Sequence, residues 1–97
     1  MPSVPRIVIV DAAGEVGRIV RGALTLMNRH CILVEVPSPE DALEEIASSN
    51  VDLVVTAYRL PGEVHGFDLA NQIVHESLET PVIVVAQEHD PRPENPD

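Results

Sequence analysis

The sequence is short of aromatic residues, basic residues and cysteines. Its 97 residues include one tyrosine, one phenylalanine, no tryptophan and no lysine, so the core must be aliphatic. Six basic and sixteen acidic residues give a formal net charge of -10, which argues against binding to nucleic acid or to an anionic membrane surface. The one cysteine, Cys31, excludes an internal disulfide and fits a reducing compartment. Because Cys31 opens an apolar run, we expect a buried structural thiol.

Long apolar runs and ligand-binding motifs are lacking as well. No apolar run approaches the ~18 residues that a membrane span needs, and the N-terminus lacks the layout of a signal peptide. The expectation is therefore a cytoplasmic protein. The four histidines show no metal-ligand spacing, and Gly14-Glu15-Val16-Gly17 is an incomplete dinucleotide fingerprint better explained as a turn before a helix. No cofactor is expected.

Short β-branched runs alternate with amphipathic segments along the chain. Strands are predicted over residues 6–10, 31–36, 51–56 and 82–86, and helices over 15 to about 29, 39 to about 48 and 66 to about 77. Ser38 is expected to cap the second helix, with Pro39 at its first position and Asp41 completing an approximate capping box. Strands that alternate with helices predict a parallel sheet with right-handed crossovers.

The last ten residues differ in composition from the rest. Proline and acidic residues dominate 88–97, a composition that cannot build a packed element. We therefore expect one α/β domain over residues 1–87, followed by a disordered tail or linker over 88–97.

Several motifs, taken in order, resemble the receiver domains of two-component response regulators. The resemblance runs from Arg6 to about Gln87 and is carried by residues 7–11, 15–16, 39–43, 52–56, 60–62, 66 and 80–85. It implies a flavodoxin-like (CheY-like) open parallel sheet with strand order 2-1-3-4, lacking the fifth strand and the last helices of the family.

The chemistry that the resemblance implies has lost its main groups. Receiver chemistry needs an acceptor carboxylate, an acidic pair that holds a divalent cation, a hydroxyl at the end of the fourth strand and a lysine. At the corresponding positions this chain has Ala57 in place of the acceptor, Asp11-Ala12 in place of the acidic pair and Ala86 in place of the hydroxyl residue. The three alanines fit either natural decay or a deliberate knock-out. We expect no catalytic residue, no metal and no enzyme activity.

Other acids are poor replacements for the acceptor. Asp52 opens a strand at the wrong end of the sheet, Asp68 lies in the first turn of a helix and Asp90 lies in the tail. Glu63, in the loop near Ala57, is the best remaining candidate, but positioning dominates phosphoryl transfer. Asp11 itself has two interpretations: a cap for the first helix or its turn, or a vestigial metal ligand.

The remaining function is expected to be contact with other proteins. If the fourth strand is the sheet edge, its uncharged apolar run is a template for pairing with a second copy, with Val82 and Val84 in the interface. The alternative is a monomer whose edge is covered. Tyr58, Arg59, Leu60 and Val64, in the loop after the third strand, are candidate contacts for a protein partner. A second, compatible reading is the regulatory receiver domain of a longer response regulator whose output domain lies outside this chain.

Overall fold

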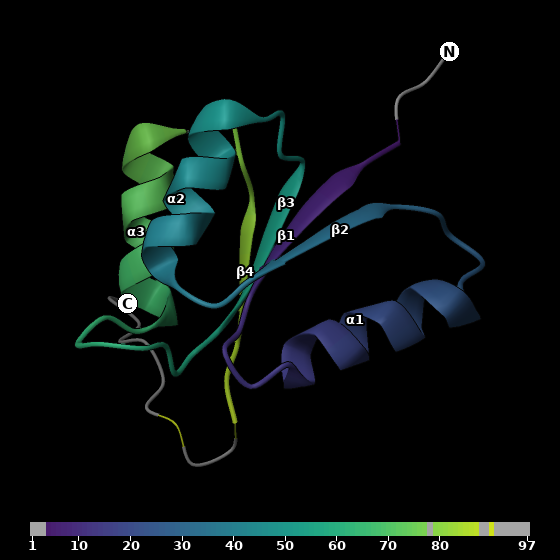
Figure 1. Cartoon of the computed structure of the whole chain (residues 1–97), viewed down its shortest axis with the longest axis horizontal. Helices are drawn as coiled ribbons and strands as arrows, with labels where there is room; N and C mark the ends of the chain where they lie inside the picture. Colours follow the sequence, from purple (N-terminus) through teal and green to yellow (C-terminus); the bar gives the residue numbers. More distant parts are fainter. Residues whose placement is uncertain (1–3, 78, 88–89, 91–97) are drawn as a thin grey trace, which may run out of the picture.

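The computed structural model describes residues 4–77, 79–87 and 90 of the 97-residue chain. Within them the elements alternate between strand and helix (Figure 1). In order they are β1 (Arg6–Val10), α1 (Glu15–Leu26), β2 (Ile32–Val36), α2 (Pro39–Ser48), β3 (Leu53–Ala57), α3 (Gly66–Glu76) and β4 (Val82–Val85). The four strands form one parallel sheet in the order β2-β1-β3-β4, which confirms the predicted fold.

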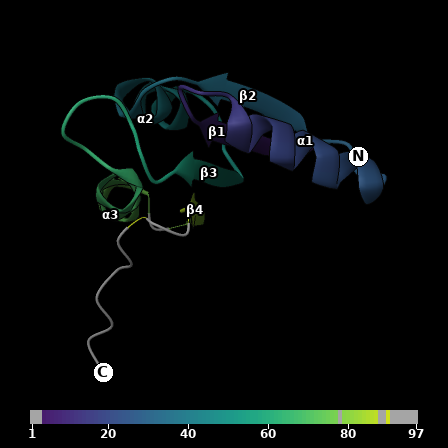
Figure 2. The ribbon, with the colours of Figure 1, turned by 90° about the horizontal axis from the view of Figure 1, so that it is seen from below.

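Helices cover both faces of this sheet, as the continuous apolar runs of its central strands require. On one face Val8, Val10 and Val54 pack with Ala42 of α2 and with Leu69 and Ile73 of α3. On the other face α1 packs against β1 and β3, and Val16 joins Ile7, Ile9 and Val55 in a second cluster. Figure 2 shows α1 lying away from β4, which forms the far margin of the sheet beside α3.

Local capping explains where the helices begin and end. The Ser38 side chain accepts a hydrogen bond from the Asp41 amide at 3.3 Å, as predicted. The first helix ends at Leu26, before the predicted end near Arg29, because Asn28 adopts a left-handed backbone with φ 52°. Asparagine tolerates that conformation, which stops a helix. β1 has the predicted bounds, and the bounds of the other three strands differ from the predicted ones by at most two residues.

The prediction of a buried Cys31 thiol was wrong, and the predicted tail is not described by the structure except at Asp90. Cys31 is only half-buried, because it precedes β2 at the margin of the α1-side cluster. The tail predicted over 88–97 lies outside the described residues, apart from Asp90. Among the residues that the structure describes, no helix is long and apolar enough to cross a membrane.

Candidate functional site

The carboxyl ends of β1, β3 and β4 lie together at one end of the sheet, where open α/β sheets bind their ligands. A cavity of about 410 Å³ opens there. Its lining is Asp11, Ala13, Glu15, Val16, Ile19, Ala57, Tyr58, Arg59, Val85, Ala86, Gln87 and Asp90. Three of the four positions singled out for receiver chemistry, Asp11, Ala57 and Ala86, therefore surround one cavity. The fourth, Ala12, is exposed in the turn after β1.

Asp11 serves as a backbone cap, as one of its two interpretations predicted. Its Oδ1 accepts a hydrogen bond from the Ala13 amide at 3.0 Å, and its Oδ2 accepts one from the Val16 amide at 2.7 Å. The helix N-cap is Gly14, which has φ 84° and offers no side-chain oxygen, so Asp11 supplies the acceptor from outside the helix. Both carboxylate oxygens therefore accept hydrogen bonds from the protein's own N–H groups.

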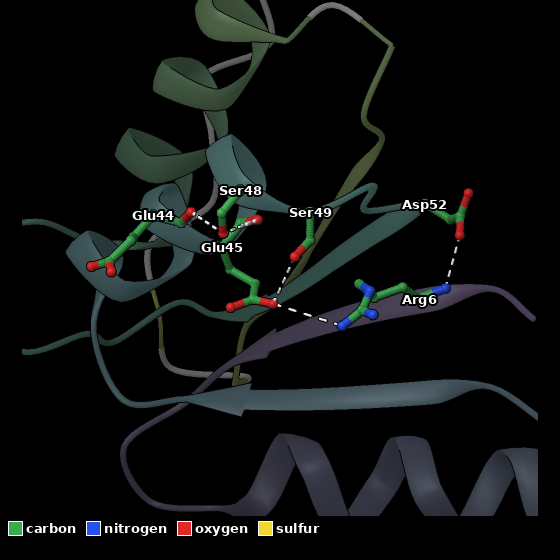
Figure 3. A network of polar contacts seen from close by, with 6 residues as sticks. All are labelled: Arg6, Glu44, Glu45, Ser48, Ser49 and Asp52. Carbon is green, nitrogen blue, oxygen red and sulfur yellow. Dashed lines mark hydrogen bonds and ion pairs between the residues drawn. The ribbon is translucent and has the colours of Figure 1, made fainter.

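Three of the other acids considered as acceptors, Asp52, Asp68 and Glu63, lie where the sequence predicted. The Asp52 carboxylate accepts a hydrogen bond from the Arg6 amide at 2.8 Å, at the amino ends of the strands (Figure 3). Asp68 lies in the first turn of α3 and closes a capping box with His65. Glu63 is exposed and lines a separate hollow of about 240 Å³. Within residues 4–77, 79–87 and 90, no group of three or more His, Cys, Asp or Glu side chains could hold a metal ion.

The loop from Tyr58 to His65 is built around an aromatic cluster that the sequence analysis missed. The Tyr58 and His65 rings stack with centroids 4.8 Å apart, and Phe67 contacts Tyr58 edge-on at 5.7 Å. His65 is also the N-cap of α3, where its Nδ1 accepts a hydrogen bond from the Asp68 amide at 3.4 Å. Histidine is an uncommon cap, so the only sequence signal was an aspartate three residues after it.

The start of α3 is pressed against the end of the sheet. The Gly66 amide donates to the Tyr58 carbonyl at 2.7 Å. A Cβ atom at Gly66 would lie 2.5 Å from the Ala57 carbonyl oxygen and 3.0 Å from Val84 Cγ1. Glycine is therefore required here for close approach of helix and strand. Of the loop residues proposed as partner contacts, Tyr58 and Arg59 line the cavity, whereas Leu60 and Val64 line the separate hollow with Glu63.

A second feature that the sequence did not predict is the position of Asp90. Its side chain is 2% exposed, and its Oδ1 lies 2.9 Å from Arg59 Nε. Its Oδ2 accepts a hydrogen bond from the Gln87 amide at 2.8 Å. An acid from the predicted tail is thus buried at the same cavity as Ala57.

The sequence profile of the response regulator receiver domain family matches residues 7–94. The chain belongs to that family. Receiver domains are regulatory signalling modules, so the expectation of a two-component signalling protein that is not an enzyme is confirmed. A search among curated proteins finds no match.

Solved structures agree with this assignment. The receiver domain resembles the signal receiver domain of an HD domain-containing protein from Pseudomonas fluorescens Pf-5, with 29% identity and a TM-score of 0.71 over 91% of this chain and 68% of that one. It resembles the non-phosphorylated HemR receiver domain from Leptospira biflexa at 25% identity and a TM-score of 0.67, over 90% of this chain and 68% of that one. An aspartate-to-alanine mutant of the MaeR response regulator bound to sulfate shares the fold, at 23% identity and a TM-score of 0.76 over 91% and 71% of the two chains.

Proposed function

We propose that this receiver domain is a degenerate one that works without phosphorylation, by contact with other proteins. The observation that carries the proposal is the methyl group of Ala57 at the cavity end of β3. A methyl group cannot attack phosphorus, and phosphoryl transfer depends on positioned groups more than on covalent chemistry supplied by the protein. Of the other acids considered, Glu63 lines a different hollow, and Asp90, which lines the same cavity, is paired with Arg59.

The state of the metal position supports the same proposal. Mg²⁺ in phosphoryl-transfer sites is held by one or two carboxylates together with phosphate oxygens. Asp11 already accepts two backbone hydrogen bonds, and Ala12 offers no ligand. Asp11 is therefore the one carboxylate left of the acidic pair, and it also caps α1.

Incubation with acetyl phosphate and Mg²⁺ tests the proposal directly. Intact-mass spectrometry is expected to show no gain of a phosphoryl group on the wild-type chain. The matched variant Ala57→Asp restores a carboxylate at the same place and serves as the comparison. Stoichiometric labelling of the wild type, at Glu63 or at any other residue, would overturn the proposal.

We further propose that the protein partner includes a second copy, paired through the edge of β4. The Val54 amide donates to the Pro81 carbonyl at 3.0 Å, and the Tyr58 amide donates to the Val85 carbonyl at 2.9 Å. The carbonyl groups of Pro81 and Val85 therefore point toward β3. Because the N–H and C=O groups of successive residues point to opposite sides of a strand, those of Val82 and Val84 point to the open edge. Residues 80–87 carry no charge, so two copies can approach there despite a net charge of -10.

The register of this pairing follows from the same alternation. In an antiparallel pair about a two-fold axis, Val82 would lie opposite Val84 of the second copy, and Ile83 would lie opposite its own equivalent. Ile83 is 51% exposed in the single chain, and its side chain would be closest to its copy because it occupies a non-hydrogen-bonded pair.

Light scattering on a sizing column, across a concentration series, measures the association. A dimer is expected for the wild type, and Ile83→Lys is expected to give a monomer because two like charges would meet at the axis. The control is Ile32→Lys, a change to a 42% exposed isoleucine on β2, the other edge strand, which should leave the dimer intact. A wild-type monomer at all concentrations would refute the pairing and would leave the Tyr58–Val64 loop as the candidate surface.

The alternative function is a regulatory receiver domain within a longer response regulator. It rests on the proline-rich composition of residues 88–97, which is typical of linkers. It is compatible with phosphorylation-independent contact, because an output domain would be one more protein surface. A coding segment for a folded domain after residue 97 in the parent gene would favour it.

A further inference from the structure

Asp90 is the buried charged residue of the part of the chain that the structure describes; the other buried polar residues there are Thr56 and Thr80. Burying a carboxylate is unfavourable unless charged and hydrogen-bonding groups compensate it. Those groups are present at Asp90. Arg59 Nε lies 2.9 Å from one oxygen, and the Gln87 amide donates to the other at 2.8 Å.

Two reciprocal hydrogen bonds join Asp90 to Gln87. The Asp90 amide donates to the Gln87 carbonyl at 3.0 Å, while the Gln87 amide donates to the Asp90 side chain at 2.8 Å. Gln87 and Asp90 line the cavity together with Ala57, Asp11 and Tyr58.

We infer that the Arg59 guanidinium and the Gln87 amide form a carboxylate-binding site over Ala57, and that Asp90 is its resident ligand. Hydrogen bonds in which both partners are charged are among the strongest that proteins make. The site lies at the cavity where the family carries out its acyl-phosphate chemistry. A carboxylate of the chain itself therefore lines the cavity beside Ala57, which occupies the acceptor position.

The position of Arg59 gives the site a consequence for partner binding. Arg59 also lines the neighbouring hollow with Tyr58, Glu63 and His65, the loop proposed to contact a partner. While its Nε pairs with Asp90, that donor is withheld from a partner. This consequence, which rests on the proposed function, makes Asp90 an internal competitor for acidic groups of a partner that bind Arg59.

Tyr58 provides a built-in probe of the cavity. It is the one tyrosine of a chain without tryptophan, and it lines the cavity. Quenching of its emission by acrylamide is expected to increase in Asp90→Asn, which keeps the size of the side chain and removes its charge. Arg59→Gln should increase quenching to the same degree, and the double variant should add nothing further.

A matched control breaks an ion pair far from the cavity, at the amino end of β1. Glu45→Gln removes the charged partner of Arg6, whose Nη1 lies 3.7 Å from Glu45 Oε1 (Figure 3), and should leave the quenching of Tyr58 unchanged. Circular dichroism of each variant verifies that the fold is kept. Unchanged quenching in a folded Asp90→Asn, or additive effects in the double variant, would overturn the inference. Either result leaves the labelling test of phosphorylation independence untouched, so the two proposals fail separately.

Discussion

The two faces of the sheet are filled to different degrees. On the face of α2 and α3, two helices bury a continuous cluster in which Val8, Leu69 and Ile73 are fully enclosed. On the face of α1, one helix covers β1 and β3, while Ile19 and Ile83 remain 62% and 51% exposed. The comparison separates a face that stabilises the domain from a face that still offers apolar surface next to the open strand β4.

The largest expected effect is on the filled face. Leu69→Ala removes a side chain that is 0% exposed between α3 and the sheet, and should lower the free energy of unfolding by about 3 kcal/mol. The same substitution at Leu26, which is 90% exposed at the end of α1, should change it by less than about 0.5 kcal/mol. Urea denaturation followed by circular dichroism measures both. Should Leu69→Ala prevent folding, Ile73→Val, expected to cost about 1 kcal/mol, keeps the comparison measurable.

A second contrast lies in how closely each helix approaches the sheet. Gly66→Ala would place a methyl group 2.5 Å from the Ala57 carbonyl oxygen, which is backbone and cannot turn aside. The start of α3 would have to shift, at an expected cost of about 1–3 kcal/mol. The same denaturation experiment measures this loss. A neutral result would mean that α3 is held less tightly than the distance from Gly66 implies.

The sequence predicted those parts of the fold that depend on local patterns. Apolar runs gave the strands, and Ser38 with Pro39 gave the start of α2, because capping involves residues only a few positions apart. The helix end at Leu26 was missed because the left-handed backbone of Asn28 competes with an apolar pattern that continues to Met27. The prediction that Asp11 caps α1 was confirmed, since its partners follow it closely in the chain.

The candidate site was predicted less completely than the fold. Parallel topology alone brings Asp11, Ala57 and Ala86 to the carboxyl ends of neighbouring strands, so their position around one cavity was predictable. The pairing of Arg59 with Asp90 was not, because it joins a loop to a segment whose composition indicated a tail. The stacking of Tyr58 on His65 likewise depends on how the loop folds back, which places Arg59 and His65 in an isolated antiparallel β-bridge.

The attachment of α1 to the sheet gives a smaller expected effect. Asp11→Ala removes the acceptors of the Ala13 and Val16 amides, and should cost about 1 kcal/mol. Asp11→Asn keeps one acceptor oxygen and should cost less. If Asp11 were instead a working metal ligand, Mg²⁺ would raise the stability of the wild type and not that of Asp11→Ala. Thermal unfolding with and without Mg²⁺ separates these outcomes.

The smallest expected effect has the opposite sign. Gly22 lies inside α1, and a Cβ atom placed there meets nothing within 4 Å. Gly22→Ala should therefore stabilise the domain by about 0.5–1 kcal/mol, because alanine loses less conformational freedom than glycine when a helix forms. Set beside Gly66→Ala, the same substitution separates a position pressed against the sheet from a helical position with open space around it. If light scattering finds the proposed dimer, a loss of stability in Gly22→Ala that is seen only at the concentrations of the dimer would mean that the second copy reaches beyond β4 and covers α1.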